Sequence, residues 1–240
     1  MKETRFFYVP QAASSDELPE EEAKHAVRVL RLQAGDELYL MDGQGTFYDA
    51  ELTLASAKHC FYRIMRALPQ QKRWQGRIHL AIAPTKMMER MEWLLEKATE
   101  IGFDEATLLL CRFSERKTAR VDRLDRIVIA ATKQSRQGWK PTLTGLTPFA
   151  HFVQTPRVGR KFICHCYEEV PKVDLYDTLR AMPPYDEVTV LVGPEGDFSL
   201  DEVRLAMAHG YESVTLGNSR LRTETAGLMA VTMAQLSKRL

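Results

Sequence analysis

The sequence predicts an α/β protein with two parts. Up to about residue 70, short strand-like runs are separated by tight turns, which is typical of a small β-barrel. From Arg77 onward, apolar runs alternate with amphipathic helical segments, which indicates a parallel sheet with helices on its faces. These later runs are almost continuously apolar, as expected for strands that are buried on both sides. The expected domains are residues 1–70 and 71–240.

Composition and charge limit the classes of partner. The chain has 240 residues, of which 45% are hydrophobic and 27% charged, and its net charge is +1. An RNA partner would therefore be bound by local basic patches and not by a global positive field. The N-terminus lacks the apolar core of a signal peptide, and no uncharged apolar run is long enough to cross a membrane. We expect a soluble, cytoplasmic protein.

The first part reads as one strand, one helix and a β-meander. Residues 5–9 (RFFYV) form a strand candidate, and residues 16–31 read as a helix with acids in its first turn and bases in its last. Residues 36–52 read as strand, Asp-Gly turn and strand, and residues 60–68 as the closing strand. The polar segment PQQKRWQG, residues 69–76, is the expected linker.

The second part alternates strands with helices. Residues 77–83 are a strand, and residues 86–102 a helix whose apolar side chains share one face and which Gly102 ends. Another strand and another amphipathic helix follow, over residues 106–111 and 121–135. The remaining apolar runs are residues 161–166, 188–193 and 213–217.

The stretch LVGPEGDFSLDEV leaves a buried strand through two glycines. The carboxyl end of a parallel strand faces the ligand crevice of an α/β sheet, and Gly193 and Gly196 permit close backbone approach. Glu195 and Asp197 make this loop a poor phosphate cradle, because like charges repel. The alternative is an ordinary strand-to-helix connection.

A capping box follows the same loop. Ser199 and Glu202 have the spacing of this motif, so a helix should begin at Leu200 and end near His209, with Gly210 as its stop.

Two more stretches should end at the same edge of the sheet. LGNSRLRTETAGLMAV carries Arg220 and Arg222 in a loop, then a helix of small residues from Thr223, where polar groups also serve as caps. KFICHC places His165 between two cysteines, which resembles a metal cluster. Strand alternation puts the two cysteines on one face and His165 on the other, so buried thiols are favoured over zinc and no metal is expected.

Basic residues gather locally. Arg28 and Arg31 lie in RVLRL, Arg116 in SERKTAR, and Arg136 in TKQSRQGWKP. Each patch alone is typical of a solvated face, but together with interleaved aromatic residues they could bind RNA phosphates and stack a base.

Taken together, these stretches resemble one family. GPEGDFSLDEV, LGNSRLRTETAGLMAV, EWLLEKATEIG, SERK, KQSR and HAVRVLRL look like the RsmE-type 16S rRNA (uracil-N3)-methyltransferases of the SPOUT superfamily, and they occur in the expected order over nearly the whole chain. Two positions depart from the family pattern. Asp197 stands where glycine is usual, and Arg220 where an aliphatic residue is usual.

The resemblance implies a fold, a cofactor and partners. The first domain should be a PUA-like RNA-binding β-barrel, and the second a SPOUT domain whose last elements form a deep trefoil knot. The implied cofactor is S-adenosylmethionine, and the implied substrate is a uridine N3 in 16S rRNA, within an assembled small ribosomal subunit. The family works as a homodimer.

The resemblance also implies site residues. Arg222 is the candidate for steadying the uracil carbonyls, and Glu195 and Glu224 are candidates for the general base, with a helix cap as the simpler role of Glu224. Arg28, Arg31, Arg116 and Arg136 are candidates for RNA contacts. The expected cofactor-binding residues are His165, Val192, Gly193, Gly196, Leu216, Gly217, Leu221, Arg222 and Ala226.

Rival functions remain at this point. A Rossmann oxidoreductase needs a glycine fingerprint in its first strand-to-helix turn, but that turn reads AIAPTKMMER. An RNA-binding protein without catalysis, or a methyltransferase of another RNA, would fit the barrel and the basic patches equally well.

Overall fold

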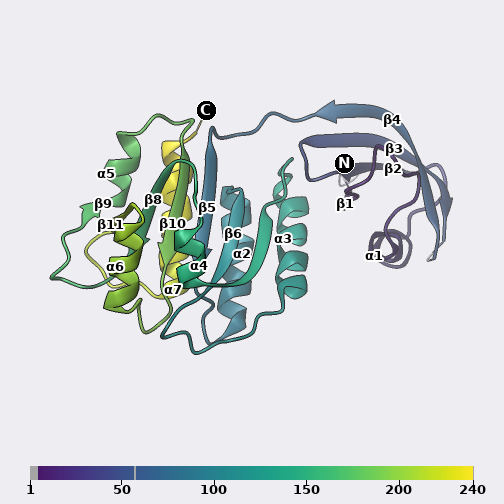
Figure 1. Cartoon of the computed structure of the whole chain (residues 1–240). Helices are drawn as coiled ribbons and strands as arrows, with labels where there is room; N and C mark the ends of the chain where they lie inside the picture. Colours follow the sequence, from purple (N-terminus) through teal and green to yellow (C-terminus); the bar gives the residue numbers. More distant parts are fainter. Residues whose placement is uncertain (1–4, 57, 240) are drawn as a thin grey trace. The chain divides into compact units, whose positions relative to one another are not determined.

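The computed structural model describes residues 5–56 and 58–239, and its contacts divide the chain into two compact units (Figure 1). The N-terminal unit holds the chain up to Lys72 together with Ile129–Lys140, and the C-terminal unit holds Arg73–Val128 and Pro141–Leu240. Helix α3 (Val121–Ser135) therefore contributes its first half to one unit and its second half to the other. The sequence did not indicate this return of residues 129–140 to the first unit.

The N-terminal unit is built on a four-stranded sheet in the order β1-β2-β3-β4. Strand β1 runs parallel to β2, and the β2–β3 and β3–β4 pairs are antiparallel, as the strand–turn–strand pattern predicts. Its core is apolar and includes Phe7, Leu38, Leu40 and Leu52. The bounds are β1 Phe6–Tyr8, β2 Glu37–Met41, β3 Thr46–Ala55 and β4 Cys60–Pro69.

The helix expected over residues 16–31 is shorter than predicted and changes type. Helix α1 (Glu20–Lys24) begins after Pro19 and continues as the π-helix η1 (His25–Val29). The amide of Leu30 donates to the carbonyl of His25, five residues earlier. Arg28, in this π-helical segment, and Arg31, just after it, are both exposed.

The C-terminal unit contains a seven-stranded sheet in the order β7-β6-β5-β10-β8-β11-β9. Every pair in it is parallel, so the predicted parallel sheet is confirmed. The strands are β5 Arg77–Ile82, β6 Glu105–Leu110, β7 Thr142–Pro148, β8 Arg160–Cys164, β9 Val173–Asp174, β10 Glu187–Val192 and β11 Tyr211–Thr215. Besides α3, the helices are α2 Met88–Ile101, α4 Phe149–Gln154, α5 Leu175–Arg180, α6 Leu200–Ala208 and α7 Thr223–Ser237.

Helices cover both faces of this sheet (Figure 1). On one face, α2, α5 and α7 pack on alternate strand residues, such as Ile78, Leu80 and Ile82 of β5. On the other face, α4 and α6 pack on the intervening residues, such as Ala81 and Leu191. Both sides of each central strand are therefore buried, which explains the continuous apolar runs in the sequence.

The segment expected to be a linker, residues 69–76, is divided between the units, and its part from Arg73 on is anchored in the C-terminal unit. The Trp74 side chain is 3% exposed and belongs to the core, and its indole Nε1 donates to Asp104 Oδ2 at 3.0 Å. The end of α7 is fastened nearby, because the buried Lys238 Nζ donates to the carbonyl of Pro184 at 3.0 Å. The amide of Gln75 also donates to the carbonyl of Lys238 at 2.9 Å, so the two ends of the C-terminal unit are joined directly.

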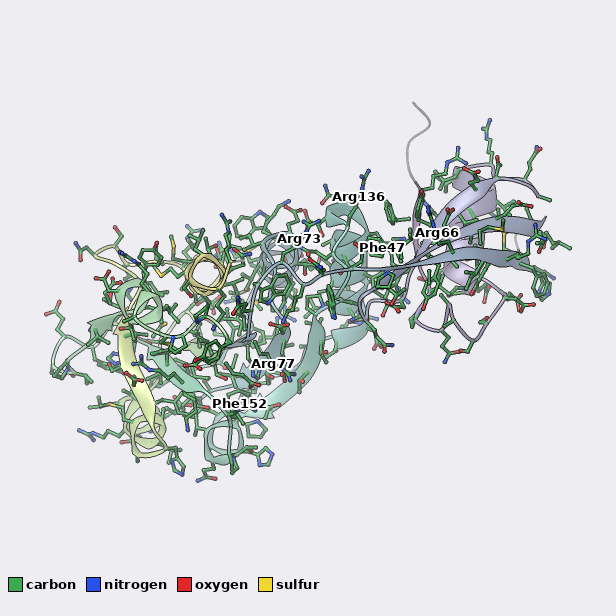
Figure 2. The ribbon with its side chains drawn as sticks, turned by 90° about the horizontal axis from the view of Figure 1, so that it is seen from above. Phe47, Arg66, Arg73, Arg77, Arg136 and Phe152 are labelled. Atoms are coloured by element: carbon green, nitrogen blue, oxygen red, sulfur yellow. The ribbon has the colours of Figure 1, made fainter. Side chains whose placement is uncertain are left out.

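A buried histidine lies in β5, among polar groups within the sheet. His79 Nε2 lies 2.9 Å from Thr107 Oγ1, and its Nδ1 lies 3.3 Å from Nη1 of Arg157. The guanidinium of Arg157 also covers the Phe152 ring at 3.8 Å (Phe152 is labelled in Figure 2). Burial, followed by the positive charges of Arg157 and Arg77, lowers the pKa of His79 from 6.5 to about 3.

This shift predicts a loss of stability in acid. His79 stays neutral in the folded protein between pH 6.5 and about 3, whereas the unfolded chain takes up the proton. Its contribution to the free energy of unfolding is therefore complete above pH 6.5. Below pH 6.5 that free energy falls by up to about 1.4 kcal/mol per pH unit. In urea unfolding at a series of pH values, the free energy of unfolding of His79→Gln should fall less steeply with decreasing pH than that of the wild type. His151→Gln, at an exposed position on α4, should behave like the wild type. If the free energy of unfolding had the same dependence on pH in the wild type and in both variants, this role of His79 would be contradicted.

No helix among residues 5–56 and 58–239 is long and apolar enough to cross a membrane. The trefoil knot that the resemblance implies stays a prediction.

Candidate functional site

A pocket of about 830 Å³ opens at the carboxyl edge of the parallel sheet. Strands β10, β8 and β11 are neighbours in the sheet, so the loops that follow them meet there. These are the three loops that the sequence singled out. All the predicted cofactor-binding residues except Gly196 line the pocket, and so do Glu195 and Arg222. The residues expected to bind the cofactor thus lie together around one pocket, and their role in binding stays a prediction.

The glycines of the β10 loop make room for the protein's own chain. A Cβ on Gly193 would lie 3.0 Å from the backbone nitrogen of Phe198, and one on Gly196 would lie 3.1 Å from Cβ of Phe113. The glycine with a demanding backbone is Gly217, whose φ of +116° is one that side-chain-bearing residues rarely adopt, and nothing lies within 4 Å of its Cβ position. At Gly217 glycine is therefore needed for the backbone conformation after β11 and not for space.

Asp197 connects two of the three loops. It has a φ of 65°, in the left-handed region, which aspartate tolerates better than most residues. Its Oδ2 accepts a hydrogen bond from the backbone of Cys166 at 2.8 Å, and its Oδ1 accepts one from the backbone of Phe198 at 2.7 Å. The carboxylate therefore has a definite structural task where a glycine would have none.

His165 is buried in the pocket wall. Its Nε2 lies 2.6 Å from Ser213 Oγ, while its Nδ1 has no hydrogen-bond partner among the described residues. Burial, and then the charge of Lys172, lowers the pKa of His165, so its ring is neutral near pH 7. A neutral imidazole with one unpaired nitrogen can bind a polar group of a ligand.

The thiols differ from the expectation of buried cysteines. Cys60 and Cys111 are buried, but Cys164 is only half-buried and Cys166 is exposed, and both of the latter line the pocket. The expectation was wrong for Cys166, because strand β8 ends at Cys164 and the alternation of the strand does not continue. Among the residues with described coordinates, no cluster of three His, Cys, Asp or Glu side chains could hold a metal ion.

The start of α7 supplies one exposed cation and one buried acid. Arg222 is the N-cap residue, and its side chain is exposed on the pocket wall. Glu224, in the first turn, is 7% exposed, and its Oε1 lies 3.4 Å from Nη1 of Arg90. Arg90 lines the pocket but Glu224 does not. The sequence missed Arg90, because α2 carries no motif that marks it.

Glu195, at the rim of the pocket, is hydrogen-bonded to the loop that contains Lys86. Its Oε1 accepts a hydrogen bond from the backbone nitrogen of Lys86 at 2.8 Å. The carbonyl of Lys86 in turn accepts two hydrogen bonds from the guanidinium of Arg116, at 3.1 and 2.7 Å. The structure thus brings Arg116 and Glu195 to the same loop, although they are far apart in the sequence.

The other predicted RNA-binding arginines belong to the N-terminal unit. Arg28, Arg31 and Arg136 are all exposed. Arg136 follows α3 with a φ of 53°, and its guanidinium lies 5.2 Å from the centre of the Phe6 ring (Arg136 is labelled in Figure 2). An exposed arginine on an aromatic ring is a surface suited to RNA.

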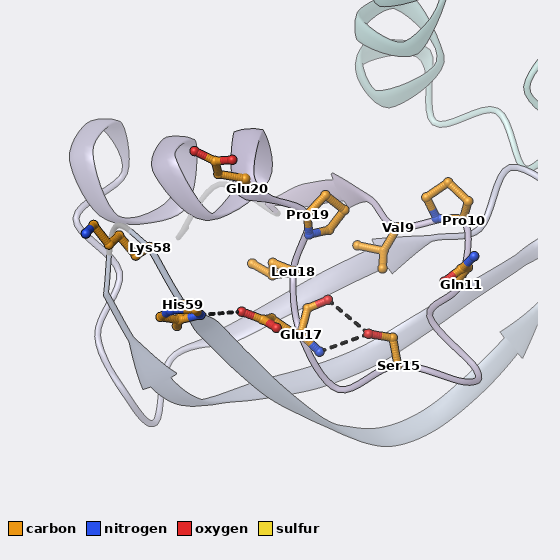
Figure 3. A pocket seen from close by; sticks show the side chains of 10 residues that line it. All are labelled: Val9, Pro10, Gln11, Ser15, Glu17, Leu18, Pro19, Glu20, Lys58 and His59. Atoms are coloured by element: carbon orange, nitrogen blue, oxygen red, sulfur yellow. Dashed lines mark hydrogen bonds and ion pairs between the residues drawn. The ribbon is translucent and has the colours of Figure 1, made fainter.

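The N-terminal unit has a hollow of its own, of about 650 Å³ (Figure 3). Its polar groups largely pair with one another: His59 Nδ1 lies 2.8 Å from Glu17 Oε1, and the Ser15 hydroxyl exchanges hydrogen bonds with the backbone of Glu17. With Glu17 and Glu20 in its wall, it is a poor phosphate site.

The chain matches two family models. Residues 72–235 match the model described as the RNA methyltransferase domain, and residues 18–65 match the RNA methyltransferase PUA domain. Both matches lie in the order that the resemblance predicts.

Curated relatives and solved structures are similar over most of their length. The ribosomal RNA small subunit methyltransferase E of Synechocystis is 29% identical over 208 residues, which cover 85% of this chain and 67% of that protein. A probable rRNA-methyltransferase from Porphyromonas gingivalis is 42% identical, with a TM-score of 0.89 and 98% of both chains covered. The methyltransferase E of Neisseria gonorrhoeae, bound to S-adenosyl methionine, is 26% identical, with a TM-score of 0.84 and 98% of both chains covered.

Proposed function

The chain belongs to the family of the RNA methyltransferase domain, and from this premise we propose that it methylates N3 of a uridine in 16S ribosomal RNA with S-adenosylmethionine as methyl donor. The observation that carries the proposal is the pocket at the carboxyl edge of the sheet, lined by the three loops after β8, β10 and β11. A structure that covers 98% of this chain is a small-subunit rRNA methyltransferase with this cofactor bound.

The residues of the pocket suit this cofactor. Val192, Leu216, Leu221 and Ala226 provide apolar wall for an adenine ring. The unpaired Nδ1 of the buried His165 provides one polar partner. Arg90 and Lys172 offer cations for a carboxylate, and Glu168 offers an anion for an ammonium group. The pocket needs no phosphate-binding loop, because the cofactor carries no phosphate.

The chain's own residues would orient the base, hold charge and move one proton. Bound S-adenosylmethionine would supply a methyl group already activated by the sulfonium. Arg222 binds the uracil carbonyls and stabilises the anion that forms when N3 loses its proton. Glu195 accepts that proton, which is a contribution of about 10²–10⁴-fold for a general base. Holding the uracil in line for attack on the methyl group supplies the remaining rate acceleration, because the reacting atoms are already oriented.

Partners and location follow from the same proposal. The substrate is 16S rRNA within an assembled small subunit, so the place of action is the cytoplasm. We propose a homodimer, and two exposed apolar side chains two turns apart on one face of α7, Met229 and Leu236, support it. The exposed arginines of the N-terminal unit, Arg28, Arg31 and Arg136, are proposed to hold the RNA.

The target uridine should have to be unpaired. N3 lies on the Watson–Crick edge, so the base must be single-stranded or flipped out when it reacts. With labelled cofactor, small subunits that lack the modification should be methylated at least roughly tenfold faster than a short uridine-containing oligonucleotide, because shaped RNA sites present such bases. The same subunits carrying 3-methyluridine beforehand are the control and should accept no label.

Two outcomes would contradict the proposal. Equal rates on subunits and on the oligonucleotide would contradict the recognition of a shaped site. Calorimetry that detects no binding of S-adenosylmethionine would favour an RNA-binding protein without catalysis.

A further inference from the structure

We infer that Asp197 is a positioning residue whose carboxylate ties the loop after β8 to the loop after β10 and thereby sets the affinity of the pocket for S-adenosylmethionine. The inference rests on the proposed function for its ligand, but the tie itself is a property of the free protein.

The tie lies just beyond the point where the sheet ends. Strands β8 and β10 pair in register up to Cys164 and Val192, and beyond this pair the chains separate to form the pocket. A backbone amide just past the ladder has lost its strand partner and can donate to another acceptor. For Cys166, two residues further on, that acceptor is Asp197 Oδ2 at 2.8 Å.

The Asp197 carboxylate uses both of its oxygens as hydrogen-bond acceptors. Oδ1 accepts from the amide of Phe198 at 2.7 Å, which fixes the side chain relative to its own turn. That turn is closed by the amide of Asp197, which donates to the carbonyl of Pro194 at 2.9 Å. A second bond joins the same loops, because the Tyr167 hydroxyl donates to the carbonyl of Phe198 at 2.8 Å. The two loops therefore form one pocket wall.

Removing the Asp197 side chain should change the affinity for the cofactor more than it changes the stability of the fold. The φ of 65° at Asp197 is unfavourable for a residue with a side chain and free for glycine. In Asp197→Gly, the relief of this conformation offsets part of the lost hydrogen bonding, so thermal stability should change little while the loop after β8 is released. A released loop must be ordered again by the ligand, which weakens binding.

The variants Asp197→Gly and Asp197→Asn test the affinity. Gly offers no side-chain acceptor, and Asn keeps the size but offers one oxygen for two amide donors. Both variants should therefore raise the Kd for S-adenosylmethionine roughly tenfold, the effect of losing one charge-assisted hydrogen bond. At saturating cofactor, kcat should stay within about threefold of the wild type. The matched control is Asp201→Asn, which removes a carboxylate that is 74% exposed and lies four residues away on α6. It should leave both constants unchanged.

A readout without cofactor tests the tie directly. In the free protein, amide hydrogen exchange at Cys166 should become at least tenfold faster in both Asp197 variants and stay unchanged in Asp201→Asn. Burial and then the charge of Asp197 raise the pKa of the Cys166 thiol, so Asp197→Asn should also speed its alkylation, followed by peptide mass spectrometry.

The measurements distinguish a failure of the inference about Asp197 from a failure of the proposed function. Unchanged exchange at Cys166, or an unchanged Kd with faster exchange, overturns the inference. A wild-type protein that does not bind S-adenosylmethionine overturns the proposed function instead, and the tie is then judged on the exchange measurement.

Discussion

Replacing Arg222 with alanine should lower kcat for methyl transfer by about 10²–10³-fold. This loss should exceed any change in the Kd for S-adenosylmethionine, although Arg222 also lines the cofactor pocket. The magnitude is that of removing one hydrogen-bond donor to the anion that develops in the transition state. Arg222 suits this task because its side chain is exposed on the pocket wall, while only its backbone is needed at the start of α7. The carbonyl of Arg222 accepts from the amide of Ala226 at 2.8 Å, and alanine preserves that bond.

The matched control is Arg220→Ala. Arg220 is also exposed and also lines the pocket, two residues earlier in the same loop. Both variants lose one positive charge, so a general effect of charge on RNA affinity should appear in both as a higher KM. Only Arg222→Ala should lose kcat. Full methylation by Arg222→Ala with unchanged cofactor binding would contradict the assignment.

Features whose partners are near in sequence could be predicted from the sequence. The capping box is the clearest case: Ser199 Oγ accepts from the amide of Glu202 at 3.3 Å, Glu202 Oε2 accepts from the amide of Ser199 at 2.8 Å, and α6 begins at Leu200 as expected. The strands around the pocket were likewise predictable, because burial on both faces demands continuous apolar runs.

Features that depend on residues distant in the sequence could not be predicted from the sequence. Glu202 Oε1 also accepts from the amide of Arg112, and no local pattern relates two residues so far apart. Asp197 was the position that the family resemblance left unexplained, and its partner Cys166 lies 31 residues earlier. Arg90 reaches the pocket only because α2 packs beside α7. Each of these contacts depends on tertiary packing, which periodicity and capping signals do not contain.

Glutamine variants distinguish Glu195, the proposed general base, from Glu224, the other candidate. Glu195→Gln should lower kcat by about 10²-fold or more and remove the acid limb of the pH–rate profile, because glutamine cannot take up a proton. Glu224→Gln should keep kcat within about tenfold and retain that limb. The difference in expectation follows from placement: Glu195 is exposed and lines the pocket, whereas Glu224 is 7% exposed and is absent from the pocket wall.

Each residue also has a structural contact, so the measurement must separate the two roles. Glu195 Oε1 holds the amide of Lys86, and glutamine keeps an oxygen for that bond, so loss of the loop contact does not account for the expected drop. Glu224 Oε1 lies 3.4 Å from Nη1 of Arg90, so Glu224→Gln should act mainly through Arg90, as a changed Kd for cofactor. If Glu224→Gln alone abolished the acid limb, Glu224 would be the proton acceptor, and Glu195 would serve only to fasten the loop at Lys86.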